Sequence, residues 1–444
     1  MTQNLASLYP AHVATLRARH DKALAATGFD HFVAFAGNPH TIFLDDMDYP
    51  FKANPHVKYW APVVDNPFCF VVYSPGKKPK FVYNRPVDYW HKVAGEPEGY
   101  WVEQFDVVSI ATPEEAQQHM PSSGKAAFVG EWDSMFESWS FAGRNPADLM
   151  NRLHFDRVCK TPYEAACMRE ATVKGVRAHI AAAKAFVAGA SEYDIHLEYL
   201  RVAGHMEHEL PYGNIIAMNR NAAVLHYMDT ERKPLEEARR HSFLIDAGAQ
   251  VNGYACDITR TWAQRDDEFA AMVRAVDAMQ LRLVDMVKPG VDYKQIHLAT
   301  HLETAKILAD FGLITCSPES AVETRVSSAF FPHGVGHLLG LQVHDVGGFM
   351  ADASGTTIPK PEGHPYLRLT RVIEKNMVFT IEPGIYFIDS LLDEVKKGPH
   401  ASAVSWERVA DFHRYGGIRI EDDVMVTETG VENFTRDEWA RQEN

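Results

Sequence analysis

A recurring helix and cap pattern is the feature that most restricts how this 444-residue chain can fold. The segment Gly189-Ala-Ser-Glu-Tyr-Asp-Ile-His-Leu197 resembles Gly290-Val-Asp-Tyr-Lys-Gln-Ile-His-Leu298, and each follows a long amphipathic stretch, 162–187 and 266–287. Two such units indicate a duplicated half-domain, although a chance match of two short segments is the alternative. The duplication predicts helices over one face of a sheet built from both halves, with ligands from the two halves close together.

Length and local pattern predict two domains, because 444 residues exceed one ordinary core. Residues 1–158 contain the apolar run His31–Ala36, a hairpin from Phe68 to Asn84, and strand-bearing segments 100–110 and 125–132, with helical stretches between them. We therefore expect a small α/β domain with a mixed sheet. Thr161-Pro-Tyr-Glu164 has the form of a capping box with proline in the first turn, so a second domain is predicted over residues 159–444. A second capping box, Ser191-Glu-Tyr-Asp194, is expected to begin another helix.

Composition excludes several classes of function. A chain with 46% hydrophobic and 23% charged residues is typical of a soluble globular protein. The formal net charge of -15 and the lack of a basic patch argue against nucleic acid as a partner and favour a small molecule or peptide. No apolar run is long enough to span a membrane, and the first residues lack a secretory signal pattern. Five scattered cysteines without CxxC spacing indicate a reducing compartment, the cytoplasm.

A strand-turn-strand pattern surrounds the pair Asn252-Gly253, the strongest short hairpin signal. This turn places Asp246 across from Thr259, so that Asp257, two residues before Thr259, projects from the same face as Asp246. An ionised carboxylate beside an apolar run is unfavourable without a counter-charge, which a divalent ion would supply. For either aspartate alone, a salt bridge to Arg260 or exposure to water is the alternative.

The segment 331–345 carries His333, His337 and His344 among three glycines. Glycine lets the backbone approach a ligand closely, and neutral imidazole is a common nitrogen donor for first-row divalent ions. A surface loop with solvated histidines is the alternative interpretation.

Two strand-like segments, 377–387 and 416–426, each contain a carboxylate in an apolar setting, Glu382 and Glu421, and Pro383-Gly384 is expected to stop the first. A charge at such a position is costly unless it is paired. Arg419 is an alternative partner for Glu421. Taken together, the carboxylates and the histidines are the inventory of a two-metal hydrolase.

The order and context of five donors resemble the pita-bread metallopeptidases, which include prolidases, aminopeptidase P and methionine aminopeptidases. The donors are Asp246, Asp257, His337, Glu382 and Glu421, within segments that include HGVGH and IEPG. The resemblance covers roughly residues 160–435. Creatinases share the fold but lack these ligands, and methionine aminopeptidases lack a first domain. Segments 43–50 and 88–92 are similar to bacterial Xaa-Pro dipeptidases, the group that includes organophosphorus acid anhydrolases.

This resemblance implies an α/β (α+β) fold class, with a small mixed-sheet domain followed by a pita-bread catalytic domain of pseudo-twofold symmetry. It implies hydrolysis of dipeptides that end in proline or hydroxyproline, by attack of a metal-bridging hydroxide on the carbonyl before proline. The five donors would bind two divalent ions per subunit, Mn²⁺ as the first choice and Zn²⁺ or Co²⁺ as alternatives.

The resemblance also implies roles for individual side chains. Glu382 would move a proton to the leaving nitrogen, and His344 and His226 would assist catalysis. Arg368 would bind the free carboxylate of the dipeptide, although its neighbour Arg371 keeps this assignment open. The remaining predicted substrate-binding residues are His333, Tyr212 and Arg419.

Three alternatives to a dipeptidase remain at this point. Aminopeptidase P would act on longer Xaa-Pro peptides, phosphotriester hydrolysis is a potential side activity, and an inactive relative that binds a partner would have lost the ligands. A homodimer is expected, in which the first domain of one subunit closes over the site of the other through Asp45 or Trp90. The sequence does not specify the residue preferred before proline.

Overall fold

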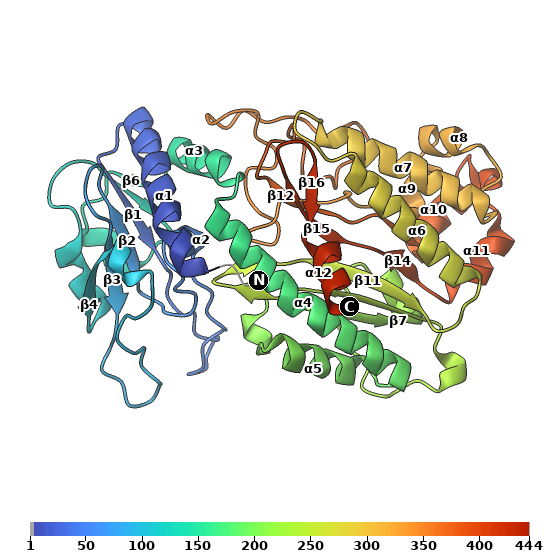
Figure 1. The fold of residues 1–444 in the computed structure, drawn as a ribbon, viewed down its shortest axis with the longest axis horizontal. Coiled ribbons are helices and arrows are strands. Elements are labelled where there is room, and N and C mark those ends of the chain that lie inside the picture. The colour runs from blue at the N-terminus through green and yellow to red at the C-terminus, as the bar shows by residue number, and fades with distance from the viewer. Residues whose placement is uncertain (1–3, 444) are drawn as a thin grey trace. The chain divides into compact units, whose positions relative to one another are not determined.

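In the computed structural model, which describes residues 4–443, the chain forms two compact units (Figure 1). The first unit consists of residues 1–167 with 251–254 and 351–356, and the second contains 168–250, 255–350 and 357–444. Both units contain helices and strands, as the sequence predicts. Among residues 4–443, no helix combines the length and the apolar character needed to cross a membrane.

A six-stranded mixed sheet forms the centre of the first unit, in the order β4-β3-β2-β1-β5-β6. Strand β2 is antiparallel to β1 and β3, whereas the β3–β4, β1–β5 and β5–β6 pairs are parallel. The predicted mixed sheet and its first hairpin are therefore confirmed. The strands are β1 (His31–Phe35), β2 (Phe70–Tyr73), β3 (Lys80–Asn84), β4 (Asp106–Ile110), β5 (Ala126–Val129) and β6 (Gly143–Arg144).

The strand expected within 100–110 begins only at Asp106, because Val102–Gln104 forms a 3-10 turn (η1). Trp101, at the start of this turn, packs edge-on against Phe81 of the sheet, with ring centroids 5.1 Å apart. This packing buries the large side chain of Trp101, and the backbone directly before β4 is a 3-10 turn instead of a strand. The other helical elements of this unit are α1 (Leu5–Thr27), α2 (Pro55–Lys58), α3 (Ala147–Arg157), η2 (Pro113–His119) and η3 (Ser134–Ser138).

Both predicted capping boxes form. The Thr161 N–H donates to Glu164 Oε2 (2.8 Å) and the Glu164 N–H donates to Thr161 Oγ1 (3.3 Å), which starts α4 (Pro162–Ala188). Ser191 caps α5 (Glu192–Ala203) in the same reciprocal way. Each cap satisfies N–H groups that the helix itself leaves without a partner, which contributes about 1 kcal/mol.

The second unit contains short strands in several small sheets, in the orders β11-β8-β7, β12-β15-β16 and β13-β14, and each strand of the further β10-β9 pair has one residue in either unit. They are β7 (Ile215–Met218), β8 (Ser242–Ala247), β9 (Gln250–Val251), β10 (Tyr254–Ala255), β11 (Ile258–Ala263), β12 (Val378–Ile381), β13 (Gly384–Tyr386), β14 (Gly417–Arg419), β15 (Asp422–Val426) and β16 (Val431–Asn433). The further helices are α6 (Glu268–Asp285), α7 (Tyr293–Asp310), α8 (Pro318–Glu323), α9 (Val326–Phe330), α10 (Asp389–Lys397), α11 (Trp406–His413) and α12 (Phe434–Glu443). Four 3-10 turns connect them: η4 (Glu207–Glu209), η5 (Asn219–Ala223), η6 (Glu237–Arg239) and η7 (Ala401–Ala403).

The helix pairs of the repeat pattern are present, as α4 with α5 and α6 with α7. Alternation along β8 decides which way its side chains face. Phe243 and Ile245 pack with residues of α4 and α5 in one apolar cluster, whereas Leu244 belongs to a cluster on the opposite face. Asp246, two residues after Leu244, therefore points away from α4 and α5.

The strands expected over 377–387 and 416–426 are not continuous, and each breaks at its glutamate. Strand β12 pairs with β15, and after the breaks β13 pairs with β14, so Glu382 and Glu421 lie at the junctions of two small sheets. Pro383 has no N–H for a sheet ladder, and its carbonyl instead accepts from the Ile420 N–H at 3.2 Å. The stop at Pro383-Gly384 is the predicted one, whereas the periodicity of the sequence did not show the break at Glu421.

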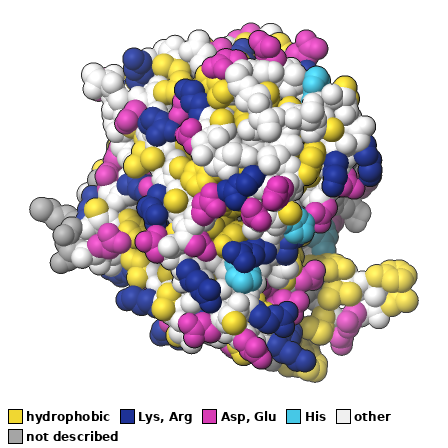
Figure 2. Space-filling view, turned by 90° about the vertical axis from the view of Figure 1, so that its right-hand side faces the viewer, with side chains coloured by type: hydrophobic (Ala, Val, Ile, Leu, Met, Phe, Trp, Pro, Cys, Tyr) yellow, Lys and Arg dark blue, Asp and Glu magenta, His cyan; other side chains and the backbone are white. Residues whose placement is uncertain are grey.

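Acidic and basic side chains are interspersed on the face of the molecule in Figure 2. Among the described side chains on that face, no field of one sign stands out. This agrees with the modest excess of acidic residues, 59 against 44 basic, being spread along the chain.

Candidate metal centre

The two aspartates reach the centre through the predicted hairpin register. Asp246 on β8 lies across from Thr259 on β11, as the turn position predicts. Asp257 does not lie within the strand but directly before it, and its N–H donates to Asp423 Oδ2 at 3.0 Å. The bond to a buried carboxylate replaces a ladder hydrogen bond and holds the backbone where the side chain enters the centre.

His337 lies in an extended segment beside β12. The Thr380 N–H donates to the His337 carbonyl (3.0 Å), and the Glu382 N–H donates to the Val335 carbonyl (2.7 Å). Gly336 between them has φ of 158°, and a Cβ there would lie 2.0 Å from the Thr380 carbonyl oxygen. Only glycine permits this close approach, which brings the imidazole beside Glu382.

Three donor atoms converge at His337. Its Nε2 lies 3.4 Å from Asp257 Oδ2 and 3.6 Å from Glu382 Oε1. Its Nδ1 donates to the Leu338 carbonyl at 3.0 Å, so Nε2 is the ring nitrogen that faces the carboxylates. Donor atoms of Asp257, His337 and Glu421 all lie within 4.8 Å of one another.

Thr259 and Arg419 orient the other two carboxylates. The Thr259 hydroxyl donates to Glu421 Oε2 at 2.6 Å and accepts from Arg419 Nε at 3.2 Å. Arg419 Nη2 donates to Asp246 Oδ2 at 2.6 Å. Arg419 thus forms its ion pair with Asp246 and not with Glu421, and Arg260 pairs with Asp422 (2.7 Å) and not with either aspartate.

The pKa shifts of the four carboxyl groups show that the side chains of the cluster do not fully compensate one another's charge. Burial raises the pKa values of Asp246 and Glu421, and it raises that of Glu382 to about 7. Burial also acts upward on the pKa of Asp257, but hydrogen bonding and charge from His337 outweigh it and hold that pKa below its usual range. Among residues 4–443, Asp246 Oδ1 is buried with no hydrogen-bond partner.

Four carboxylates and one imidazole, with a single guanidinium on one of them, fit a group of positive charge. Oxygen-rich donor sets with one nitrogen suit hard or borderline divalent ions. The orphaned oxygen of Asp246 and the raised pKa of Glu421 are what such a charge would relieve. The residues present therefore fit divalent metal ions.

Tyr212 and His333 border this cluster. The Tyr212 hydroxyl donates to Asp257 Oδ1 at 2.5 Å. His333 Nδ1 lies 3.7 Å from Glu382 Oε2 and 2.8 Å from the Gly334 carbonyl, and its Nε2 lies 2.8 Å from the Tyr386 hydroxyl. Both predicted substrate-binding residues therefore lie beside the donors.

His344 stacks edge-on against His337, with ring centroids 4.4 Å apart. Burial lowers the pKa of His344 to about 4, with further contributions from His337 and Arg368 and a smaller one from His226. Arg368 and His226 are exposed side chains on loops, and both contribute to the lowered pKa of His344.

Two residues of the centre, Thr259 and Tyr386, were not predicted from the sequence as members of the site. The Tyr386 hydroxyl accepts a hydrogen bond from Arg419 Nη1 (2.9 Å) and lies 2.8 Å from His333 Nε2. Tyr386 therefore links Arg419 and His333, two of the predicted substrate-binding residues. The position of Thr259 across from Asp246 was a usable signal, whereas Tyr386 lies behind the strand break at Pro383 and gave none.

Both parts of the chain match known protein families. Residues 7–155 match the N-terminal domain of Xaa-Pro dipeptidases, and residues 166–428 match metallopeptidase family M24. The chain is 51% identical over 440 residues to the Xaa-Pro dipeptidase of Stenotrophomonas maltophilia (strain K279a), which covers 99% of this chain and 98% of that relative. It is 52% identical over 443 residues to the Xaa-Pro dipeptidase of Xanthomonas campestris pv. campestris (strain B100), covering 99% and 100%.

The aminopeptidase PepP of Pseudomonas aeruginosa has a similar structure, with a TM-score of 0.72 at 22% identity over 97% of this chain and 98% of that chain. Zinc-substituted Escherichia coli aminopeptidase P in complex with product gives a TM-score of 0.71 at 23% identity, over 95% and 94%. This likeness shows the fold, a mixed α/β domain followed by a pita-bread domain.

Proposed function

The chain belongs to metallopeptidase family M24, and on that premise we propose that it hydrolyses Xaa-Pro dipeptides at the cluster around His337. The observation that carries the proposal is the convergence of Asp257, His337 and Glu421 within 4.8 Å, in a chain about half identical over its length to Xaa-Pro dipeptidases. The aminopeptidase P structures share the fold at 22–23% identity, which does not extend to substrate choice. The dipeptidase is therefore preferred over aminopeptidase P.

Divalent metal ions follow from membership of a metallopeptidase family. We assign two ions to Asp246, Asp257, His337, Glu382 and Glu421, and Mn²⁺ as the native ion because four of the five donors are carboxylates. Such ions supply an activated water molecule and polarise the scissile carbonyl. Elemental analysis of protein purified without added metal tests the assignment, and Zn²⁺ or Co²⁺ at two per chain would contradict it.

The protein's own groups would then handle protons and charge. Glu382, 3.6 Å from His337 and 3.7 Å from His333, would carry the proton of the attacking water to the proline nitrogen. His344, held neutral by its low pKa, would donate a hydrogen bond to the developing oxyanion, and His226 would contact the substrate from the exposed side.

Arg368 would set the length of the substrate by binding its free carboxylate. It is an exposed arginine whose charge contributes to the lowered pKa of His344, which supports a guanidinium within electrostatic reach of the reacting centre. The neighbouring Arg371 is buried and donates to Glu374 at 2.6 Å, which makes it the weaker candidate. His333, Tyr212 and Arg419 would complete the pocket.

The substitution Arg368→Ala tests the proposal directly. We expect kcat/KM for Ala-Pro to fall roughly 10–100-fold, since a hydrogen bond to a charged group contributes about 1.5–3 kcal/mol. The loss should be absent with Ala-Pro-amide, which lacks the carboxylate. Arg274→Ala, at an exposed arginine of α6, is the matched control.

Two results would contradict the dipeptidase. One is an equal loss on Ala-Pro and its amide in Arg368→Ala, and the other is a wild-type rate on Ala-Pro-Gly above that on Ala-Pro, which would indicate aminopeptidase P. Hydrolysis of organophosphate triesters at the same centre stays a prediction, to be measured with a chromogenic triester.

We further propose that residues 1–158 act in dimerisation and site closure and that residues 159–444 form the catalytic domain. Support comes from large apolar side chains beside Asp45 and at position 90 that are exposed in the single chain: Phe43 (85%), Leu44 (91%) and Trp90 (77%). A fully active monomer in analytical ultracentrifugation would contradict the dimer. A cytoplasmic location is supported by the five cysteines, which form no disulfide in the described chain, and recovery of the native protein from a secreted fraction would contradict it.

A further inference from the structure

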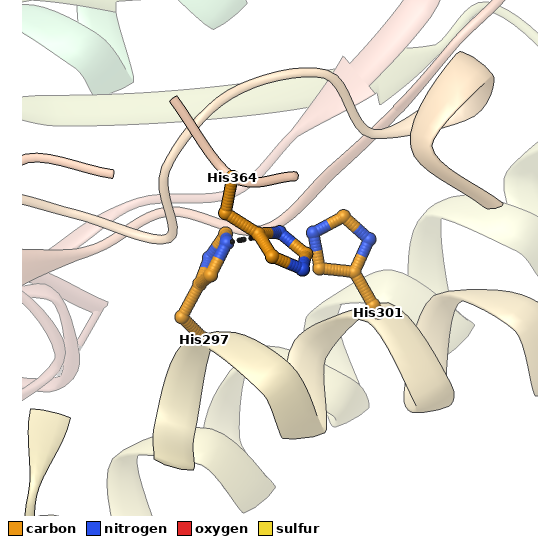
Figure 3. Close-up of side chains that lie close together, drawn as sticks. All are labelled: His297, His301 and His364. Carbon is orange, nitrogen blue, oxygen red and sulfur yellow. Dashed lines mark hydrogen bonds between the residues drawn. The ribbon is translucent and has the colours of Figure 1, made fainter. Parts of the chain in front are cut away.

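A second cluster of metal-binding side chains lies in the same unit and consists of three histidines (Figure 3). His297 and His301 project from successive turns of α7, and His364 reaches them from a loop. Their nitrogen atoms lie within 4.8 Å of one another. His297 and His301 are only 1% and 3% exposed, and His364 is half-buried. We name this group the histidine triad.

Three of the six ring nitrogen atoms of the histidine triad are buried without a hydrogen bond in the described chain. His297 Nε2 and His364 Nδ1 are 2.9 Å apart and share one hydrogen bond. Within residues 4–443, His297 Nδ1 and both ring nitrogens of His301 are buried without any hydrogen bond. Buried polar atoms without a partner are rare in folded proteins and point to a bound water molecule or ion.

We propose that His297, His301 and His364 bind one divalent transition-metal ion of the Zn²⁺ type, separate from the carboxylate centre. Histidines at positions i and i+4 of a helix present two nitrogens to one ion, and a third from a neighbouring segment makes a three-imidazole set. A tetrahedral ion with Zn–N bonds of about 2.0–2.1 Å keeps its ligands roughly 3.3 Å apart. In the triad the His297–His364 pair, at 2.9 Å, would open by a few tenths of an ångström, and any longer separation, up to 4.8 Å, would shorten as the rings close on the ion.

The chemistry of the triad selects for borderline metals. It contains no carboxylate, so Mg²⁺, Ca²⁺ and Mn²⁺ lack the oxygen donors that they prefer. Burial lowers the pKa of His297 to about 2 and that of His301 to about 3, so both rings are neutral and keep a lone pair for an ion. The partly exposed side of His364 leaves room for a solvent molecule as fourth ligand.

Arg325 is the charged group that most affects His364. After burial, it is the main cause of the lowered pKa of His364, and its guanidinium lies against Gly363. A fixed positive charge opposes protonation of the imidazole, which favours the neutral ligand, and it also opposes a cation. The site therefore depends on the strength of imidazole donation and not on charge attraction.

The ring of Phe331 contacts both the triad and His333, which belongs to the proposed substrate pocket. Phe331 packs against His301 (5.1 Å between centroids) and also against His333 (4.7 Å). The loop that begins at His364 continues to Arg368, four residues later. An ion in the triad would fasten this loop to α7 and so steady Arg368, a consequence that rests on the proposed function, whereas the metal site does not.

Metal counting in the full-length protein tests the site. We expect a variant with Asp257→Asn and Glu421→Gln, which removes two donors of the carboxylate centre, to retain one Zn²⁺ per chain after equilibrium dialysis with micromolar Zn²⁺. Adding His364→Gln should remove that ion. His364 is the partly exposed member of the triad, so its replacement carries the smallest risk to folding. With Co²⁺ in place of Zn²⁺, the visible absorption of a four-coordinate ion should appear and then vanish with His364→Gln.

The wild-type background provides the second measurement, because there His364→Gln should lower the Zn²⁺ content by one ion per chain. His208→Gln, at an exposed histidine, should leave the content unchanged. An unchanged ion count in both His364→Gln and His301→Gln would overturn the proposal and leave the triad as a hydrogen-bonded histidine cluster. Peptidase activity that survives in the Asp257→Asn, Glu421→Gln variant would instead refute the carboxylate centre, which the Zn²⁺ count of the triad does not test.

Discussion

The carboxylate centre and the histidine triad lie in the same structural unit but differ in how they would hold a metal ion. At the carboxylate centre, four acidic side chains face a single guanidinium, and burial raises the pKa values of Asp246, Glu382 and Glu421. In the triad, the same burial lowers the pKa values of the rings and leaves neutral donors. Burial therefore leaves the carboxylate centre in need of a positive charge, whereas it leaves the histidine triad with neutral nitrogen donors that can bind a cation.

This difference shows that burial alone does not define a metal site. Removing a carboxylate from water is costly, so a cluster of buried carboxylates needs a cation for its own stability. A buried neutral imidazole loses only hydrogen bonds, and a water molecule or a partner side chain can replace them. The carboxylate centre is thus expected to bind ions through charge, and the triad through donor type.

The largest expected effect that separates the two sites is that of Glu421→Gln. This change keeps the shape of the side chain but removes a charge that no guanidinium compensates. We expect kcat on Ala-Pro to fall at least roughly 10²–10³-fold, as for loss of one preorganised electrostatic group, while the triad keeps its ion. Steady-state kinetics with metal analysis measures both, and Glu407→Gln on the exposed side of α11 is the control. Loss of the triad ion as well would show that the two sites are not independent.

A smaller effect is expected from Thr259→Val. The threonine hydroxyl donates to Glu421 and accepts from Arg419, and valine has the same shape without these bonds. Removing a group that orients a ligand typically costs about 10–100-fold in metal affinity. Titration of the metal-depleted enzyme with Mn²⁺, followed by activity, should show the weaker binding. Thr315→Val, at an exposed threonine, should bind Mn²⁺ like the wild type, and an unchanged affinity in Thr259→Val would mean that Glu421 is held by other contacts.

The smallest effect is expected from Tyr386→Phe. The lost hydroxyl accepts from Arg419 and meets His333, which in turn lies against the ring that contacts the triad. One net hydrogen bond contributes about 1 kcal/mol, so kcat/KM should fall roughly fivefold with both metal sites intact. Kinetics and metal content together check this. A change in triad metal content would show that Phe331 transmits changes between the two sites.

Prediction from the sequence succeeded where local pattern decides the outcome. The Asn252-Gly253 turn predicts the register of Asp246 and Thr259, and the capping boxes at Thr161 and Ser191 begin the helices as expected. Pro383-Gly384 predicted the break after β12, but prediction failed at the break before Asp422, because the apolar alternation of 416–426 gave no sign of it. A break depends on which sheet the next residues pair with, and that partner is far away in the sequence.

The residues of the histidine triad also differ in how far local sequence predicts their positions. The spacing of His297 and His301 was readable as one face of a helix, but His364 had no local signal. Its loop position relative to α7 follows from how the chain between them packs, and not from any nearby residue.

The sequence by itself determined the hairpin register and the helix starts, because each depends on residues within a few positions of one another. The set of five donors stays a prediction that rests on the family resemblance. Only the tertiary structure decided that Arg419 pairs with Asp246, that Thr259 orients Glu421, and that His364 joins His297 and His301. These contacts join segments far apart in the chain. Their geometry is set by the packing of whole helices and sheets, and no single stretch of sequence is sufficient to predict that packing.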